Sequence, residues 1–249
     1  MKIGLRGGHS KNCIGAVGIV DEYSQMQKFY THVESILKSA GHTVIDCNSD
    51  ANTQSQELFE GVSKANRFNV DLFISLHMNA FDGSANGTEC LVSSASSGAY
   101  ATAQKICSNF SNLGFKNRGV KFQSLYEMKN VKAPNIIFEI CFCDSKTDID
   151  IYNRYSWEQL ARTLCNAIDN NIPLSAEQSK GYVVTNYLPP AYGGYDGVDI
   201  KYILEYFEGV KCYVRGNNKG VWIETEYLTV DKCQALKNKL GSWFYSIEK

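Results

Sequence analysis

The first 170 residues alternate between short apolar runs and longer segments in which apolar residues recur every three or four positions. Runs of the first kind favour buried strands, and the longer spacing favours amphipathic helices. Strands are predicted over 2–6, 42–47, 71–76, 87–94 and 135–142, with partial strand character over 119–128, and helices over 22–40, 55–68, 100–113 and 157–168. Alternating strands and helices indicate an α/β fold, a twisted and mostly parallel sheet with helices on both faces.

The pattern changes near residue 170. The polar segment 173–180 begins at Pro173 and shows no periodicity, so it is predicted to be a linker between domains 1–172 and 181–249. Beyond it the predicted order is strand 182–188, helix 199–207, strand 210–215, turn 216–220, strand 221–226, helix 230–240 and strand 243–247. This βαββαβ order is that of a small α+β domain with a ferredoxin-like arrangement.

Composition narrows the possible functions. The chain has 249 residues, 44% hydrophobic and 20% charged, and a net charge of −1, so we expect neither nucleic acid nor a membrane surface as partner. No apolar segment is long enough to span a bilayer, and the N-terminus lacks a secretory signal. We therefore expect a protein kept in the cytoplasm of its host until something releases it.

The cysteines predict no disulfide framework. There are nine, none in a CxxC pair, and most lie among apolar neighbours, which favours free thiols in a reducing compartment. Cys141 and Cys143 are two residues apart and would share one face of a strand, so they could form a metal pair, but buried apolar filling is the favoured interpretation.

The residue that demands a chemical explanation is Glu139, a carboxylate inside the apolar run 135–142. A buried charge is costly unless it is paired, hydrogen-bonded or near a metal. His9, His77 and Glu139 each lie toward the carboxyl end of a predicted strand, where α/β proteins form their sites, and Glu22 begins a predicted helix. Two imidazoles and a carboxylate form the ligand set of a catalytic zinc with an open fourth position.

Within this set Glu22 suits the role of ligand and Glu139 that of catalytic base, because apolar surroundings raise a carboxyl pKa while a metal keeps the anion available. Simpler interpretations remain open. A lone histidine at a strand end is more often a hydrogen-bonding residue, as expected for His32 and His42. Glu139 could point outward from an edge strand. Glu22 could simply interact with the positive end of the helix dipole. The residues alone reach a zinc hydrolase and no further.

Several stretches occur in an order that resembles the zinc-dependent N-acetylmuramoyl-L-alanine amidases of autolysins and phage endolysins, the amidase-3 family. They are Gly8-His9-Ser10, Val20-Asp21-Glu22, Ile74-Ser75-Leu76-His77-Met78-Asn79-Ala80, Asn117-Arg118-Gly119-Val120-Lys121 and Ile137-Phe138-Glu139, followed by Phe142 and Asp148. The resemblance implies that His9, Glu22 and His77 bind Zn2+ and that Glu139 is catalytic. It further implies hydrolysis of the amide between N-acetylmuramic acid and L-alanine in peptidoglycan. Cys143-Asp144 departs from the small residue and asparagine usual in the family, which puts the shape of that loop in doubt.

The second domain more loosely resembles SPOR-type and related wall-binding modules of clostridial endolysins. Its aromatic residues Tyr187, Tyr192, Tyr195 and Trp222 suit sugar rings, so we expect it to bind the cell wall. The leading hypothesis is a phage endolysin. The alternatives are a bacterial autolysin, a zinc peptidase of the stem peptide, and a wall-binding protein with an inactive catalytic fold. The target species, the ligand of the second domain and the oligomeric state stay open.

Overall fold

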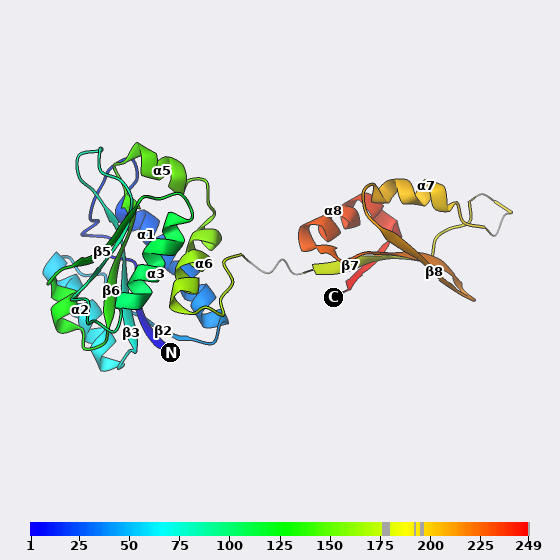
Figure 1. Ribbon diagram of the computed structural model, residues 1–249. Helices are drawn as coiled ribbons and strands as arrows, with labels where there is room; N and C mark the ends of the chain where they lie inside the picture. Colours follow the sequence, from blue (N-terminus) through cyan, green and yellow to red (C-terminus); the bar gives the residue numbers. More distant parts are fainter. Residues whose placement is uncertain (176–179, 192, 195–196, 249) are drawn as a thin grey trace. The chain divides into compact units, whose positions relative to one another are not determined.

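The structure, a computed structural model, describes residues 1–175, 180–191, 193–194 and 197–248. The chain divides into two compact units, Met1–Ala176 and Glu177–Lys249 (Figure 1). Half of the predicted linker, residues 176–179, lies outside the described residues, and so do two of the four aromatic residues proposed for wall binding, Tyr192 and Tyr195.

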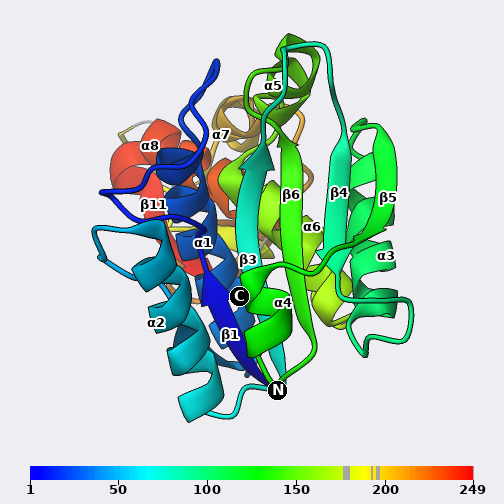
Figure 2. The ribbon, with the colours of Figure 1, turned by 90° about the vertical axis from the view of Figure 1, so that its left-hand side faces the viewer.

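The first unit is built on a six-stranded sheet with the order β2-β1-β3-β6-β4-β5 (Figure 2). Only β4 runs against its neighbour β6, and the other neighbouring pairs are parallel, which confirms the predicted mostly parallel sheet. The strands are β1 (Lys2–Arg6), β2 (Thr43–Asp46), β3 (Leu72–Asn79), β4 (Thr88–Val92), β5 (Asn117–Phe122) and β6 (Asn135–Phe142).

Helices cover both faces of this sheet. On one face α1 (Glu22–Ser39), α3 (Tyr100–Ser111) and α6 (Trp157–Ile168) form the main core, which takes Ile74 from β3. The opposite face carries α2 (Gln54–Arg67), whose Val62 packs in a smaller core with Phe73. Adjacent residues of a strand point to opposite faces of the sheet, so one apolar run contributes side chains to both cores.

Two short helices were not predicted. The segment expected to have strand character over 119–128 is strand only to Phe122, and α4 (Tyr126–Asn130) follows it. After β6 comes α5 (Lys146–Tyr152), whose N-cap Ser145 accepts a hydrogen bond from the Asp148 N–H. Helices of five and seven residues complete too few turns to show a helical period, so tertiary contacts decide their existence.

The second unit has an antiparallel sheet with the order β10-β7-β9-β8, and β11 also pairs with β7. The order along the chain is the predicted βαββαβ arrangement with one addition, the two-residue strand β10, which was not predicted. Its elements are β7 (Lys180–Thr185), α7 (Ile200–Leu204), the 3-10 turn η1 (Glu205–Phe207), β8 (Cys212–Asn217), β9 (Gly220–Thr225), β10 (Leu228–Thr229), α8 (Val230–Leu240), the 3-10 turn η2 (Gly241–Trp243) and β11 (Phe244–Glu248).

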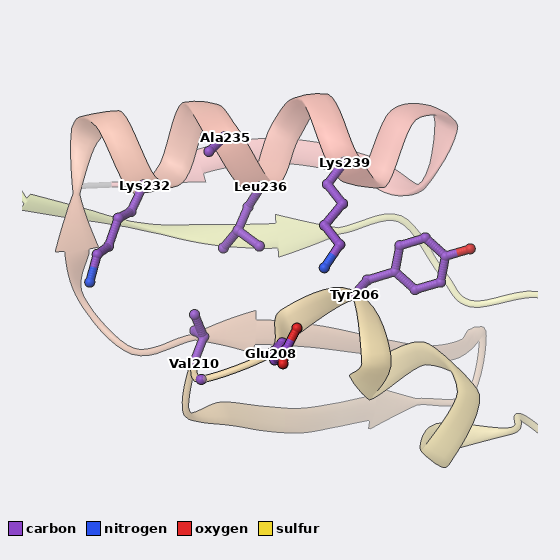
Figure 3. Close-up of a pocket in the computed structure, with 8 residues that line it drawn as sticks. Tyr206, Glu208, Val210, Lys232, Ala235, Leu236 and Lys239 are labelled. Carbon is purple, nitrogen blue, oxygen red and sulfur yellow. The ribbon is translucent and has the colours of Figure 1, made fainter.

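This unit has a core of its own, in which Val183, Ile223 and Leu236 are buried. A hollow of about 260 Å³ lies between α8 and the chain that follows η1 (Figure 3). Lysines from α8 and the Tyr206 ring line it together with Leu236, so its wall is mixed in character.

All nine cysteines are free thiols, as predicted. Cys13 and Cys212 are partly exposed, and the other seven, including Cys141 and Cys143, are buried. Among the described residues, every helix is too short or too polar to cross a lipid bilayer.

Candidate metal centre

His9 and Glu22 lie at opposite ends of the loop that joins β1 to α1. Asp21 caps α1 by accepting a hydrogen bond from the Ser24 N–H at 2.6 Å, which makes Glu22 the first residue of the helix. The Glu22 side chain is only 3% exposed, and its Oε2 lies 3.2 Å from His9 Nε2. Gly15 passes directly over this pair with φ of +71°, and a Cβ there would collide with the imidazole and the carboxylate.

His77 joins the pair from β3. Its Nδ1 lies 2.9 Å from Glu22 Oε1, which also accepts a hydrogen bond from the Met78 N–H at 3.0 Å. The other ring nitrogen, Nε2, is 2.9 Å from Ser75 Oγ. The centroids of the His9 and His77 rings are 5.0 Å apart, with the rings nearly perpendicular. One potential ligand atom from each of His9, Glu22 and His77 lies within 4.8 Å of the others.

The electrostatics of the cluster keep Glu22 ionised. Burial works to raise the pKa of Glu22, but the hydrogen bonds and charges of His77 and His9 together bring that pKa well below its ordinary value. Burial likewise works to lower the pKa of His77, yet the hydrogen bond to Glu22 and the charges of Glu139 and Glu22 raise it overall. A carboxylate anion that lies between two imidazoles can bind a cation together with them.

Glu139 lies next to this cluster on β6. In the sheet register it is the partner of His77 on one side and of Glu89 on the other. Lateral neighbours in a sheet project from the same face. Burial raises the pKa of Glu139 to about 7, against the attraction of His77. The side chain keeps some accessible surface, but its Oε2 is buried and has no hydrogen-bond partner among the described residues. Glu139 can therefore change protonation state near neutral pH.

Glu89, for which no role was predicted, is held by two side chains. Arg118 Nε donates to Glu89 Oε2 at 2.7 Å, and Asn79 Nδ2 donates to Glu89 Oε1 at 3.0 Å. The Arg118 guanidinium also lies 4.9 Å from the centroid of the Phe142 ring. Asn79 and Arg118 belong to the matching stretches, whereas no sequence signal marked Glu89. Arg118 offsets the negative charge of Glu89 beside Glu139.

His32 and His42 stay outside the centre, as predicted. His42 Nε2 is 3.0 Å from Asp169 Oδ2, and the His32 ring stacks on Trp157 with a centroid distance of 6.4 Å. Both histidines have structural contacts that account for them.

The residues of the centre fit a divalent metal ion. Two imidazoles and one carboxylate are a zinc ligand set that leaves a fourth position open. Negative groups in and around the centre outnumber positive ones, a surplus that a dication would offset. The glutamates are Glu22, Glu57, Glu89, Glu127 and Glu139, and the arginines are Arg6 and Arg118.

Fold and site together define an α/β protein with a mostly parallel sheet and a His–Glu–His cluster near the carboxyl ends of its strands β1 and β3. Residues 3–170 match the N-acetylmuramoyl-L-alanine amidase family, Amidase_3, and the chain belongs to this family. The match spans the first unit almost completely and includes all four predicted site residues.

Individual relatives agree with this assignment. The Clostridium perfringens protein CPE1502 is 36% identical over 174 residues, which are 68% of this chain and 52% of that protein. The endolysin of Bacillus phage SPP1 is 28% identical over 61% of this chain and 59% of its own length. Among solved structures, the catalytic domain of the CD27L endolysin targeting Clostridia Difficile has a TM-score of 0.63 and 30% identity. That match covers 68% of this chain and 97% of the domain. The chain spans about half the length of the two Clostridium perfringens proteins it matches.

Proposed function

We propose that this protein is a zinc-dependent peptidoglycan hydrolase that cleaves the amide between N-acetylmuramic acid and the L-alanine of the stem peptide. His9, Glu22 and His77 would hold the zinc ion, and Glu139 would act as general base. The observation that carries the proposal is the convergence of three ligand atoms within 4.8 Å, with Glu139 the register partner of His77. The family match supports the choice of substrate.

Each side chain has a distinct part in this reaction. Bound zinc would polarise the scissile carbonyl and acidify a water molecule. Glu139, with its pKa raised to about 7, is able to take a proton from the attacking water and pass it to the departing amine. Glu22 stays an anion because its pKa is lowered, so it does not compete for that proton.

The test is digestion of purified peptidoglycan with and without a chelator, followed by mass spectrometry of the new ends. Intact stem peptides with a free N-terminal alanine support the amidase. Shortened stems would instead favour the alternative, a zinc peptidase acting on the stem peptide. Equal digestion with and without the chelator would contradict the metal requirement.

Two kinds of variant test the assigned residues. His9→Ala and His77→Ala should lose bound zinc by metal analysis, because each removes one of three protein ligands. Glu139→Ala should keep the metal and lose wall hydrolysis. Full zinc occupancy in the histidine variants, or lysis by Glu139→Ala, would overturn the respective assignments.

We also propose that the second unit binds wall glycan. Its helices α7 and α8 lie on one face of its sheet (Figure 1), and the aromatic group proposed here comes from outside these helices. The Tyr187 and Trp222 rings lie 5.9 Å apart and, with the exposed Tyr245, line a cavity of about 310 Å³. Flat apolar rings bordered by polar groups suit the apolar face of a sugar.

Sedimentation with purified cell-wall sacculi tests this second proposal. The full chain carrying Glu139→Gln allows binding to be measured without digestion. Trp222→Ala and Tyr245→Ala should reduce the bound fraction, and Tyr202→Ala, which removes an exposed aromatic on α7, should not. Equal binding by all three variants would contradict a glycan site in this cavity.

The biological setting that fits best is a phage endolysin, kept in the host cytoplasm and released to the wall at lysis. Similarity to the SPP1 endolysin and to the CD27L catalytic domain supports it. A bacterial autolysin is the alternative. Lysis of living cells from outside, compared with lysis after expression together with a membrane-permeabilising protein, tests whether the enzyme needs such release.

A further inference from the structure

Each histidine of the metal centre has one ring nitrogen turned toward Glu22 and one turned away from it. His77 faces Glu22 with Nδ1, and its Nε2 lies 2.9 Å from Ser75 Oγ. His9 has the opposite orientation: Nε2 faces Glu22, and Nδ1 lies 3.7 Å from Glu57 Oε1. Histidines that bind metals almost always donate their second ring N–H to a fixed partner. Ser75 is in place as the partner of His77, and Glu57 is the corresponding group for His9.

Glu57 projects from α2 into the protein beneath His9. Its side chain is 2% exposed, and it pairs with the fully buried Arg6, whose Nη2 is 3.6 Å from Glu57 Oε1. Arg6 also donates from Nη1 to Glu127 Oε1 at 2.9 Å, and Glu127 comes from α4. One guanidinium therefore holds two carboxylates from two helices. Glu127 has the direct hydrogen bond to Arg6, whereas Glu57 has the contact to His9.

The Glu57 carboxylate still has unused capacity to accept hydrogen bonds. Its Oε2 is buried without a hydrogen-bond partner among the described residues, and its Oε1 lies at ion-pair rather than hydrogen-bond distance from Arg6 and His9. An unsatisfied buried carboxylate is costly. The Arg6 cluster also has one more carboxylate than guanidinium, and a hydrogen bond from an imidazole N–H alongside would stabilise the additional anion.

We propose that Glu57 is a positioning residue for His9. Its carboxylate accepts the His9 Nδ1 proton, which turns Nε2 toward Glu22 and His77 and leaves that nitrogen available to a metal ion. Arg6 is the ion-pair partner that holds the Glu57 carboxylate in place. The inference rests on the proposed function, because its purpose is to present Nε2 to a metal ion.

The competing explanation is that Arg6, Glu57 and Glu127 form only a structural ion cluster. The chain offers a matched comparison, since both glutamates are buried partners of Arg6 and only Glu57 approaches His9. A purely structural role predicts similar consequences for both. A positioning role predicts a specific effect of Glu57 on His9 and on the metal.

The experiment measures Zn2+ affinity of the full chain by competition with a chelator, in the wild type, Glu57→Ala, Glu57→Gln and Glu127→Gln. Loss of a carboxylate partner of a ligating histidine costs roughly 10–100-fold in metal affinity. We expect that loss in Glu57→Ala, a smaller one in Glu57→Gln because its amide oxygen still accepts, and wild-type affinity in Glu127→Gln. Thermal unfolding of the metal-free variants reports the stability cost separately.

A second readout needs no metal. Side-chain nitrogen NMR of the metal-free protein should show a hydrogen-bonded proton on His9 Nδ1 in the wild type and in Glu127→Gln, and Glu57→Ala should lose the signature of that hydrogen bond. Wild-type zinc affinity in Glu57→Ala, or equal loss in Glu127→Gln, would overturn the proposal. Failure of the wild type itself to bind zinc would contradict the proposed function, and the Nδ1 measurement would still decide the role of Glu57.

Discussion

At the scale of single residues, Glu139 is an ionisable side chain on a strand of the central sheet. The strand around it is apolar, and its register partners are a histidine and a glutamate. Burial raises its pKa from 4.5 to about 7. A carboxyl kept in this range can exchange a proton at neutral pH, but its ionised form costs the folded protein free energy.

We therefore expect Glu139→Gln to stabilise the metal-free protein at pH 8. The folded pKa exceeds the unfolded one, so stability is lost as pH rises from 4.5 to 7 and stays lost above that. The gain is up to about 3 kcal/mol at one pKa unit per 1.36 kcal/mol, and less in so far as solvent reaches the carboxyl. Urea unfolding at pH 8 and pH 4 measures it, with the exposed Glu158→Gln as control. A gain that persists at pH 4 would refute the explanation.

Gly15 has an equally local role. Its φ of +71° and its position against His9 and Glu22 leave no space for a side chain. Gly15→Ala should displace the loop and weaken zinc binding. Gly41→Ala is the matched control, because Gly41 has φ of +84° but nothing within 4 Å of the added Cβ. Both variants carry backbone strain of about 1–2 kcal/mol, and only Gly15→Ala should change chelator competition. Equal zinc affinity in the two variants would contradict this role.

At the scale of elements, the predictable helices of the first unit were those long enough to carry a period. The helices α1, α2, α3 and α6 were recognised from apolar spacing, and β3 and β6 from continuous apolar runs. The short α4 and α5 were not. Both supply buried carboxylates that link separate parts of the chain: Glu127 of α4 pairs with Arg6, and Asp148 of α5 binds two backbone N–H groups. Their formation depends on contacts with distant parts of the chain, which a local pattern does not encode.

Asp148 shows what α5 contributes. Its carboxylate accepts hydrogen bonds from the Gly87 N–H and the Phe142 N–H, both at 2.8 Å, and so links the start of β4 to the end of β6. Asp148→Ala leaves these two donors unpaired and should cost about 2–6 kcal/mol, at about 1–3 kcal/mol for each buried donor. Asp150→Ala on the same helix removes only an exposed pair with Lys146 and should cost under about 1 kcal/mol. Urea unfolding measures the free-energy loss of both variants, and similar losses would contradict the role of Asp148 in linking β4 to β6.

At the scale of the whole molecule, each unit has its own hydrophobic core. A ligand that binds only the folded first unit should raise the unfolding temperature of that unit alone. We expect calorimetry to show two transitions, one of which moves upward on adding zinc and returns on adding a chelator. The His9→Ala variant is the control and should show two fixed transitions. Movement of both transitions in the wild type would contradict independent units.

The candidate site was predictable from the sequence where position in an element or a known order of stretches marked a residue. His9, His77 and Glu139 stand toward the carboxyl ends of predicted strands and Glu22 at the start of a predicted helix, and the family resemblance gave the same four. The structure brings the three ligand candidates together, with Glu139 alongside. Glu57 and Glu89 were missed for a physical reason. The histidine near Glu57 is 48 positions away and the arginine that pairs with Glu89 is 29 positions away, and a glutamate on a helix or strand face gives no sign of being buried. Only three-dimensional proximity distinguishes them from solvated residues.

The distribution of thiols across the two units has a practical consequence. Seven cysteines are buried, and the two partly exposed ones, Cys13 and Cys212, fall in different units, Cys13 within the loop that connects His9 to Glu22. Alkylation by a small reagent should therefore begin at these two positions and reach the remainder only as each core opens. The natural chain thus contains reporters for local opening beside the metal centre and in the second unit, without any engineered label.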